Sequence, residues 1–139
     1  MKVILDTNIW ISFLLGKRLN VLREIFSMEK VEIFVSDQLL SEIRDVVSRP
    51  KFIGKIGLDT VLKLFELISA KCKFINDYPD IETAIRDTKD LYLLSMAENI
   101  PADYLVTGDN DLLVLRNYKE TRIITFAEFI NIVSPGEQQ

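Results

Sequence analysis

The sequence predicts an α/β fold in which a parallel sheet carries helices on both faces. Short apolar runs with strand character alternate with longer amphipathic segments along the whole chain, which is the pattern of strand–helix–strand units. Two of these runs, at 2–6 and 104–107, lead directly into polar turns that carry acids. Because the 139 residues contain no repeat and no linker, we expect one domain over 1–139, with 134–139 as a frayed tail.

Helical periodicity identifies the segments between the strands in the first half of the chain. Apolar residues recur at helical spacing after residue 7, and Gly16 stops that pattern. Ser36 or Asp37 offers an N-cap to a later helix, which Pro50 ends. The elements expected here are a strand over 2–6, helices over 7–15 and 21–28, a strand over 32–35, a helix after Ser36, a basic loop over 51–57 and an amphipathic helix over 58–72.

The second half of the chain is expected to add three strands and three helical segments. Asp87 or Thr88 offers a cap to a helix that Pro101 closes. Gly108 allows the backbone to turn sharply after a strand rich in β-branched and aromatic residues. The expected elements are a strand over 73–75, the helix that carries 91–97, a strand over 104–107, a short turn or helix over 112–115, a strand over 122–125 and a helix over 126–133.

Composition excludes several kinds of chemistry and of location. The chain has no histidine, so serine–histidine and cysteine–histidine nucleophiles and histidine-ligated zinc sites are excluded. Cys72 is the only cysteine, and its place in an apolar helical pattern predicts a buried thiol rather than a reactive one. No apolar run approaches the length of a membrane span, and the N-terminus is not a secretory signal. We therefore expect a cytoplasmic protein without a membrane segment, whose chemistry depends on carboxylates.

Five acids are expected to meet at one edge of the sheet. Asp6 follows the first strand, and Asp109 and Asp111 follow the fourth strand. Glu42 lies early in the helix after the second strand, and Asp90 lies in the first turn of a later helix. Parallel crossovers bring all these positions to the edge formed by the carboxyl ends of the strands, where ligands bind in open α/β sheets.

Carboxylates held this close repel one another, and burial raises their pKa values. A divalent cation removes the conflict, because Mg²⁺ prefers carboxylate and water oxygens. Such an ion lowers the pKa of a bound water, and two ions about 4 Å apart would flank a phosphodiester. The constellation predicts metal-dependent hydrolysis of phosphodiester bonds that leaves a 5′-phosphate.

Most of these residues also have a structural explanation. Glu42 fits an exposed helix position, and Asp90 fits the first turn of a helix, where an acid interacts favourably with the helix dipole. Asp87 suits a cap or loop better than a metal site, and Asp111 suits an Asx turn. Asp6 resists such an explanation because it ends an apolar strand. The neighbours that either orient ligands or satisfy loop backbone are Thr7, Asn8 and Thr107.

The acid-bearing segments resemble the PIN-domain family, and in particular the VapC-like toxin ribonucleases of toxin–antitoxin pairs. The resemblance covers almost the whole chain, and its four motifs are specific as an ordered set although each is weak alone. The motifs are Ile4-Leu5-Asp6-Thr7-Asn8, Ser41-Glu42-Ile43, Arg86-Asp87-Thr88-Lys89-Asp90 followed by Met96-Ala97, and Val106-Thr107-Gly108-Asp109-Asn110-Asp111-Leu112-Leu113.

The resemblance implies a three-layer α/β/α sandwich around a central parallel sheet of about five strands. It also implies Mg²⁺- or Mn²⁺-dependent endoribonuclease activity, frequent homodimers and inhibition by a small antitoxin protein. Asp6, Glu42, Asp90 and Asp109 carry over as metal ligands and catalytic residues. Asp111 carries over less firmly, as an outer ligand or a residue that positions water, and it could exchange roles with Asp109.

RNA contacts are predicted from basic residues, since phosphate attraction is mainly electrostatic. A net charge of −4 is unusual for a nucleic-acid-binding protein, so the bases would have to cluster locally. A solvated charged surface explains each base equally well. The alternatives from other classes are an aspartate-based phosphatase, which requires an Asp where Asn8 stands, and a PIN-like module that binds RNA or protein without cleavage. The basic candidates are Lys17, Arg18, Arg44, Arg49, Lys51 and Lys55.

Overall fold

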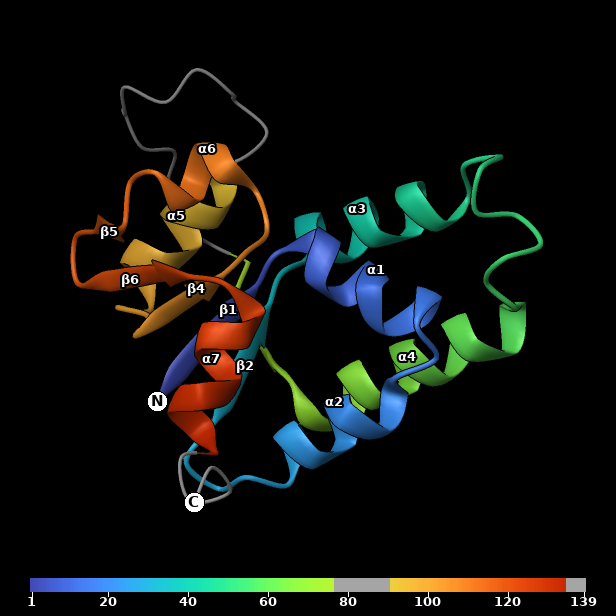
Figure 1. The fold of residues 1–139 in the computed structure, drawn as a ribbon, viewed down its shortest axis with the longest axis horizontal. Helices are drawn as coiled ribbons and strands as arrows, with labels where there is room; N and C mark the ends of the chain where they lie inside the picture. The colour runs from blue at the N-terminus through green and yellow to red at the C-terminus, as the bar shows by residue number, and fades with distance from the viewer. Residues whose placement is uncertain (77–90, 135–139) are drawn as a thin grey trace.

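A computed structural model describes residues 1–76 and 91–134 of the chain (Figure 1). The described residues contain a six-stranded sheet with the strand order β3-β2-β1-β4-β6-β5. Residues 135–139, which belong to the predicted frayed tail, lie outside the described part. The strands are β1 (Lys2–Leu5), β2 (Glu32–Val35), β3 (Lys73–Phe74), β4 (Tyr104–Val106), β5 (Asn117–Tyr118) and β6 (Thr121–Ile124).

The helices agree with the periodicity of the sequence. The helix predicted over 21–28 begins at Leu19, and the short helix predicted near residue 112 begins at Asn110. Ser36 caps α3 as predicted, because its side chain accepts a hydrogen bond from the Leu39 amide. The helices are α1 (Thr7–Leu15), α2 (Leu19–Phe26), α3 (Asp37–Val47), α4 (Leu58–Lys71), α5 (Leu91–Asn99), α6 (Asn110–Leu113) and α7 (Phe126–Val133).

The sheet is mixed and has one strand more than expected. β3, β2, β1, β4 and β6 run parallel, and β5 pairs antiparallel with β6 through Asn117↔Arg122. The predicted central parallel sheet of about five strands is confirmed, and the structure adds β5 as an antiparallel strand next to β6. β5 has only two residues and forms a hairpin in which Lys119 takes a φ of 54°. A strand this short has no alternating pattern that a sequence reading can detect.

Helices cover both faces of the sheet, which gives the predicted three layers. The connections from β1 to β2 and from β2 to β3 move along the sheet in one direction, and the return to β4 through α5 moves in the other. Right-handed crossovers therefore place α1 to α4 on one face and α5 with α6 on the opposite face, as Figure 1 shows. α7 joins the first group, because the Phe126 ring packs edge-on against Phe13 of α1 with centroids 5.5 Å apart.

β1 is the centre of the fold and positions the site. Its residues Val3, Ile4 and Leu5 are fully buried, as expected of a parallel strand with helices on both faces. The indole Nε1 of Trp10 donates to the carbonyl of Leu5 at 3.0 Å, which ties α1 to the end of β1. β2 lies on one side of β1 and β4 on the other, and the connections that lead to β2 and to β4 run in opposite directions along the sheet. The carboxyl ends of β1 and β4 therefore form a topological switch point, where open α/β sheets bind ligands.

The structure also bears on the environment of Cys72 and on the length of the helices. Cys72 is partly buried and packs against the core, and burial raises the pKa of its thiol to about 12. None of the helices in the described part of the chain has the length and apolar character needed to span a bilayer.

Candidate active site

The carboxyl ends of β1 and β4 bring Asp6 and Thr107 together. Asp6 is only 4% exposed, and its backbone N–H donates to the carbonyl of Val106 at 2.9 Å. The hydroxyl of Thr107 donates to Oδ2 of Asp6 at 2.7 Å. Although Asp6 occupies the N-cap position of α1, its carboxylate makes no capping hydrogen bond. The contact with Thr107 therefore orients this side chain toward β4.

Asp109 reaches the same place through the turn after β4. Its backbone N–H donates to Oγ1 of Thr107 at 3.0 Å, so the Thr107 hydroxyl links Asp6 and Asp109. Oδ1 of Asp109 accepts a hydrogen bond from the Asp111 amide at 2.9 Å and caps α6. Asp109, not Asp111, is thus the residue that shapes the turn, and Asp111 is exposed on the first turn of α6.

Glu42 enters the site from α3 and meets a residue that the sequence reading missed. The phenolic hydroxyl of Tyr92, on α5, donates to Oε2 of Glu42 at 2.8 Å. Tyr92 is 7% exposed. Its one available signal was a tyrosine within the apolar run Leu91-Tyr92-Leu93-Leu94, because a buried tyrosine hydroxyl usually has a hydrogen-bond partner.

The electrostatics of the site penalise negative charge. Burial raises the pKa of Asp6; hydrogen bonds from the Thr107 hydroxyl and the Thr7 amide oppose the rise, and the charges of Glu42 and Asp109 add to it. Burial, and then the Glu42 carboxylate, raise the pKa of Tyr92, so its phenol stays protonated. In the described part of the chain, Asp6, Glu42 and Asp109 form no salt bridge. A basic side chain therefore does not offset their charges there.

Thr7 contributes a buried hydroxyl close to the acids. Its Oγ1 is buried and has no hydrogen-bond partner among the described residues. The hydroxyl lies near the Tyr92 phenol, where it favours the ionised phenolate. Asn8, the other predicted neighbour at the start of α1, is exposed.

Comparison with known proteins assigns the chain to a family. The sequence model of the PIN domain matches residues 2–111, from β1 through the start of α6, and this segment includes Asp6, Glu42 and Asp109. The chain belongs to the PIN domain family. No curated protein sequence matches it.

A solved structure supports the same fold for this PIN domain. It is described as the crystal structure of VapBC2 from Rickettsia felis bound to a DNA fragment from their promoter. The match has a TM-score of 0.55 at 18% sequence identity and covers 88% of this chain and 98% of that chain. The predicted resemblance to PIN-domain proteins of the VapC-like fold is confirmed.

The oxygens in this PIN domain suit a hard divalent cation. Carboxylates and hydroxyls are the donors that Mg²⁺ and Mn²⁺ prefer. Within residues 1–76 and 91–134, no three acidic or cysteine side chains lie close enough together to bind one ion by themselves. Asp90, the predicted fourth ligand, and Asp87 lie outside the described residues. Because Mg²⁺ is usually held by one or two carboxylates and keeps several waters, Asp6 with its acidic neighbours fits the chemistry of this ion.

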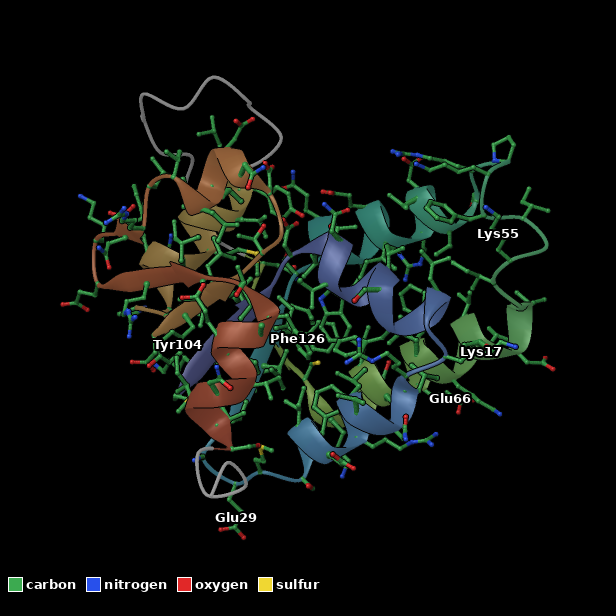
Figure 2. All side chains as sticks on the ribbon, in the orientation of Figure 1. Lys17, Glu29, Lys55, Glu66, Tyr104 and Phe126 are labelled. Atoms are coloured by element: carbon green, nitrogen blue, oxygen red, sulfur yellow. The ribbon has the colours of Figure 1, made fainter. Side chains whose placement is uncertain are left out.

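Most of the bases predicted to contact RNA lie beyond the C-terminal ends of α1 and α3, and Arg44 lies within α3, two positions after Glu42. Lys17 and Arg18 follow the C-terminal end of α1, whose nine residues separate them from Asp6 by roughly 14 Å. Figure 2 shows Lys17 and Lys55 at the end of the molecule where α1 and α3 finish. The remaining bases have local contacts: Arg44 lies over the Phe65 ring at 5.0 Å, Lys51 lies over the Phe52 ring at 4.9 Å, and Arg49 pairs with Asp45 at 3.1 Å.

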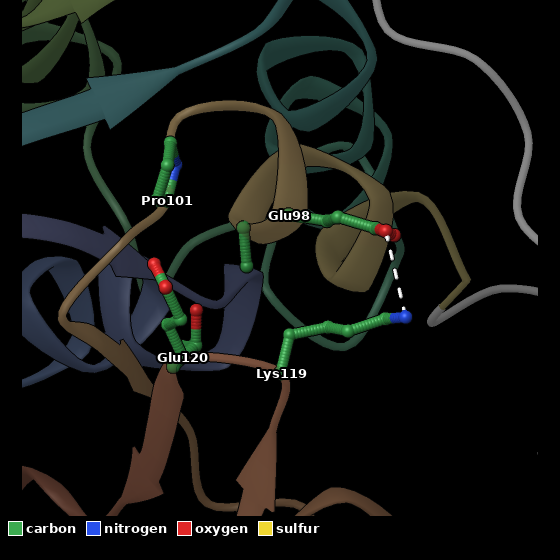
Figure 3. Close-up of a pocket in the computed structure, with 6 residues that line it drawn as sticks. Glu98, Pro101, Lys119 and Glu120 are labelled. Atoms are coloured by element: carbon green, nitrogen blue, oxygen red, sulfur yellow. Dashed lines mark ion pairs between the residues drawn. The ribbon is translucent and has the colours of Figure 1, made fainter.

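A separate depression lies at the other end of the strands, where the parallel strands begin. It has a volume of about 220 Å³ and lies between the end of α5 and the β5–β6 turn (Figure 3). Glu98 and Lys119 face each other across it, with Oε1 and Nζ 3.8 Å apart. Its charges are partly paired, and it contains none of the acids that the sequence singles out. Its lining residues are Ala97, Glu98, Pro101, Lys119, Glu120 and Thr121.

Proposed function

We propose that this PIN domain is a metal-dependent endoribonuclease that hydrolyses RNA phosphodiester bonds with Mg²⁺ or Mn²⁺. The observation that carries the proposal is the position of Asp6: a buried carboxylate at the switch point, near Glu42 and Asp109, with no salt bridge among the described residues. Membership of the PIN domain family supports it. RNA as substrate would place the protein in the cytoplasm.

The residues of the chain would act by positioning. Asp6 and Glu42 would hold the cation directly, Asp109 would contact it through one of its waters, and Asp90 is proposed as a further ligand. Asp111 would position water from the first turn of α6. Thr107 keeps the Asp6 carboxylate turned toward β4. When bound, Mg²⁺ or Mn²⁺ supplies Lewis-acid polarisation and acidifies water. An RNA strand that touches both this site and the bases at the ends of α1 and α3 would run along these two helices.

A cleavage assay tests the proposed activity. The full chain is incubated with a mixed RNA pool and Mn²⁺, in parallel with Asp6→Asn, and the fragment ends are mapped. We expect 5′-phosphate ends and a loss of rate on the order of 10²–10³-fold in Asp6→Asn, as for removal of a main electrostatic stabiliser. Products no more abundant than those of Asp6→Asn would instead favour a binding module without catalysis. Fragments with 2′,3′-cyclic phosphate ends would argue against hydrolysis by activated water.

We also propose that the protein is the toxin of a toxin–antitoxin pair. The similar solved structure is a VapBC2 complex, and a small antitoxin is the corresponding partner here. Induced expression of the chain should arrest growth of a bacterial host, and Asp6→Asn should not. Growth arrest that a short neighbouring reading frame relieves on co-expression would identify the antitoxin, and absence of any arrest would contradict the toxin role.

A homodimer is the assembly proposed for the isolated protein. Leu58 and Leu62 on α4 are 72% and 54% exposed, and they form an apolar stretch on one side of this helix. Light scattering after size-exclusion chromatography should give twice the mass of one chain. Leu62→Lys should shift that mass toward the monomer, and a monomeric wild-type protein would contradict the proposal.

A further inference from the structure

Tyr92 joins the two faces of the sheet at the candidate active site. It lies in the first turn of α5, and Glu42 lies on α3, which covers the opposite face. Fifty positions separate the two residues, and their side chains meet at 2.8 Å. The ring of Tyr92 is buried with the core of α5, so the hydroxyl has a defined position. The contact is therefore a specific tertiary interaction at the edge where the acids gather.

The chemistry of the two groups sets the direction of this hydrogen bond. The phenol O–H of Tyr92 donates and the Glu42 carboxylate accepts. Glu42 is only partly buried, and a glutamate side chain has three rotatable torsions. One fixed bond to Oε2, combined with the planarity of the carboxylate, restricts the directions in which Oε1 points.

We propose that Tyr92 is a positioning residue that orients Glu42 so that its second oxygen, Oε1, binds the divalent cation. This inference rests on the proposed function, because it concerns the same site. Partners that hydrogen-bond to metal ligands fix the orientation of those ligands and tune their affinity.

The chain contains a matched control for this contact. The hydroxyl of Tyr118 donates to Oε2 of Glu98 at 3.2 Å. Glu98 lies near the C-terminal end of α5, whereas Tyr92 lies in its first turn. The two tyrosine–glutamate pairs thus share α5 but belong to opposite edges of the sheet. Removal of either hydroxyl deletes one hydrogen bond, and only one of the two deletions touches a proposed metal ligand.

The experiment compares Tyr92→Phe with Tyr118→Phe in the full chain. Isothermal titration with Mn²⁺ measures the metal dissociation constant, cleavage of RNA gives kcat and KM, and melting in EDTA reports the fold. We expect Tyr92→Phe to weaken Mn²⁺ binding about 10-fold, and to raise the Mn²⁺ concentration for half-maximal cleavage by the same factor. KM for RNA should stay within about twofold, and Tyr118→Phe should leave all metal-dependent quantities unchanged.

A double-mutant cycle with Glu42→Gln tests whether Tyr92 acts through Glu42. If it does, Tyr92→Phe weakens Mn²⁺ binding no further when Glu42 is already Gln. Two results would overturn the inference and leave the proposed function intact. One is that Tyr92→Phe binds Mn²⁺ as tightly as the wild type; the other is that Tyr92→Phe weakens Mn²⁺ binding by the same factor when Glu42 is already Gln. Failure of the proposed function has a different signature, because the wild-type protein would then bind Mn²⁺ and cleave RNA no better than Asp6→Asn; that result would overturn both.

Discussion

The two edges of the sheet treat their charges in opposite ways. At the amino edge, where the parallel strands begin, Glu32 forms an ion pair with Lys73. Near the same edge, Glu98 faces Lys119. At the carboxyl edge, in the described part of the chain, Asp6, Glu42 and Asp109 make no such pair.

The amino edge carries charges that stabilise the fold, and the carboxyl edge carries charge that destabilises it. Exposed ion pairs such as those of the amino edge contribute about 0–1 kcal/mol each. The carboxyl edge instead raises the pKa of Asp6, so its ionised form destabilises the folded protein. Proteins tolerate such local destabilisation mainly where function requires it. The comparison therefore favours the carboxyl edge as a cation site, and four experiments test this difference between the two edges.

The largest expected effect is stabilisation by metal. A ligand at about 100 times its Kd stabilises a protein by about 2.7 kcal/mol, so Mn²⁺ should raise the Tm of the wild-type chain by several degrees. Asp6→Asn should lose most of that rise, while Glu98→Gln at the amino edge should keep it. Differential scanning fluorimetry measures all three, and an equal rise in Asp6→Asn would place the cation elsewhere.

A pair of threonine substitutions should give the next largest effect. Thr107→Val removes the hydrogen bonds to Asp6 and from the Asp109 amide. Thr121→Val removes a buried bond to the Ala102 carbonyl, 2.7 Å long, away from the acids. Each should destabilise the fold by about 1–3 kcal/mol in urea denaturation. Only Thr107→Val should also reduce RNA cleavage, and equal activity of the two variants would show that Thr107 serves the fold alone.

The pH dependence of stability should reveal the buried carboxylate. The pKa of Asp6 in the folded protein lies above its unfolded value, which is about 3.9. The folded state therefore binds the proton more tightly. The free energy of unfolding falls as pH rises from the unfolded to the folded pKa. In EDTA, the Tm of Asp6→Asn minus that of the wild type should be smallest below about pH 4. It should grow as pH rises and then level off. A difference that shrinks with rising pH would mean that ionised Asp6 stabilises the fold.

The smallest effect belongs to the amino edge. Lys119→Ala removes the partner of Glu98, but the lysine and glutamate side chains are 60% and 37% exposed, so solvent screens the interaction. The free energy of unfolding should change by less than about 1 kcal/mol, and cleavage should not change. A larger loss in chemical denaturation would mean that the paired edge contributes more to stability than exposed ion pairs usually do.

Local sequence patterns were enough to predict the order of the elements and the strand ends that carry the acids. Strong local signals explain this success: the apolar run Val3-Ile4-Leu5 for a strand buried on both sides, helical spacing for the helices, and Ser36 as a cap. The pairing of β1 with β4, which brings Asp6 beside Thr107, comes from the structure, because connection rules fix the handedness of crossovers and not which strands become neighbours. β5 escaped prediction because two residues show no periodicity.

The hydrogen bonds between polar side chains could not be predicted from the sequence and depend on the folded structure. In the sequence, Tyr92 looks like any other core residue of an apolar run. Its hydroxyl can donate to Glu42 only because the fold brings these two side chains together at the carboxyl edge. The choice of Asp109 over Asp111 as the cap of α6 depends on backbone geometry after Gly108. The bases at the ends of α1 and α3 stand apart from Asp6 because each helix carries them along its axis. Such contacts join residues far apart in sequence or depend on torsion angles, and local composition encodes neither.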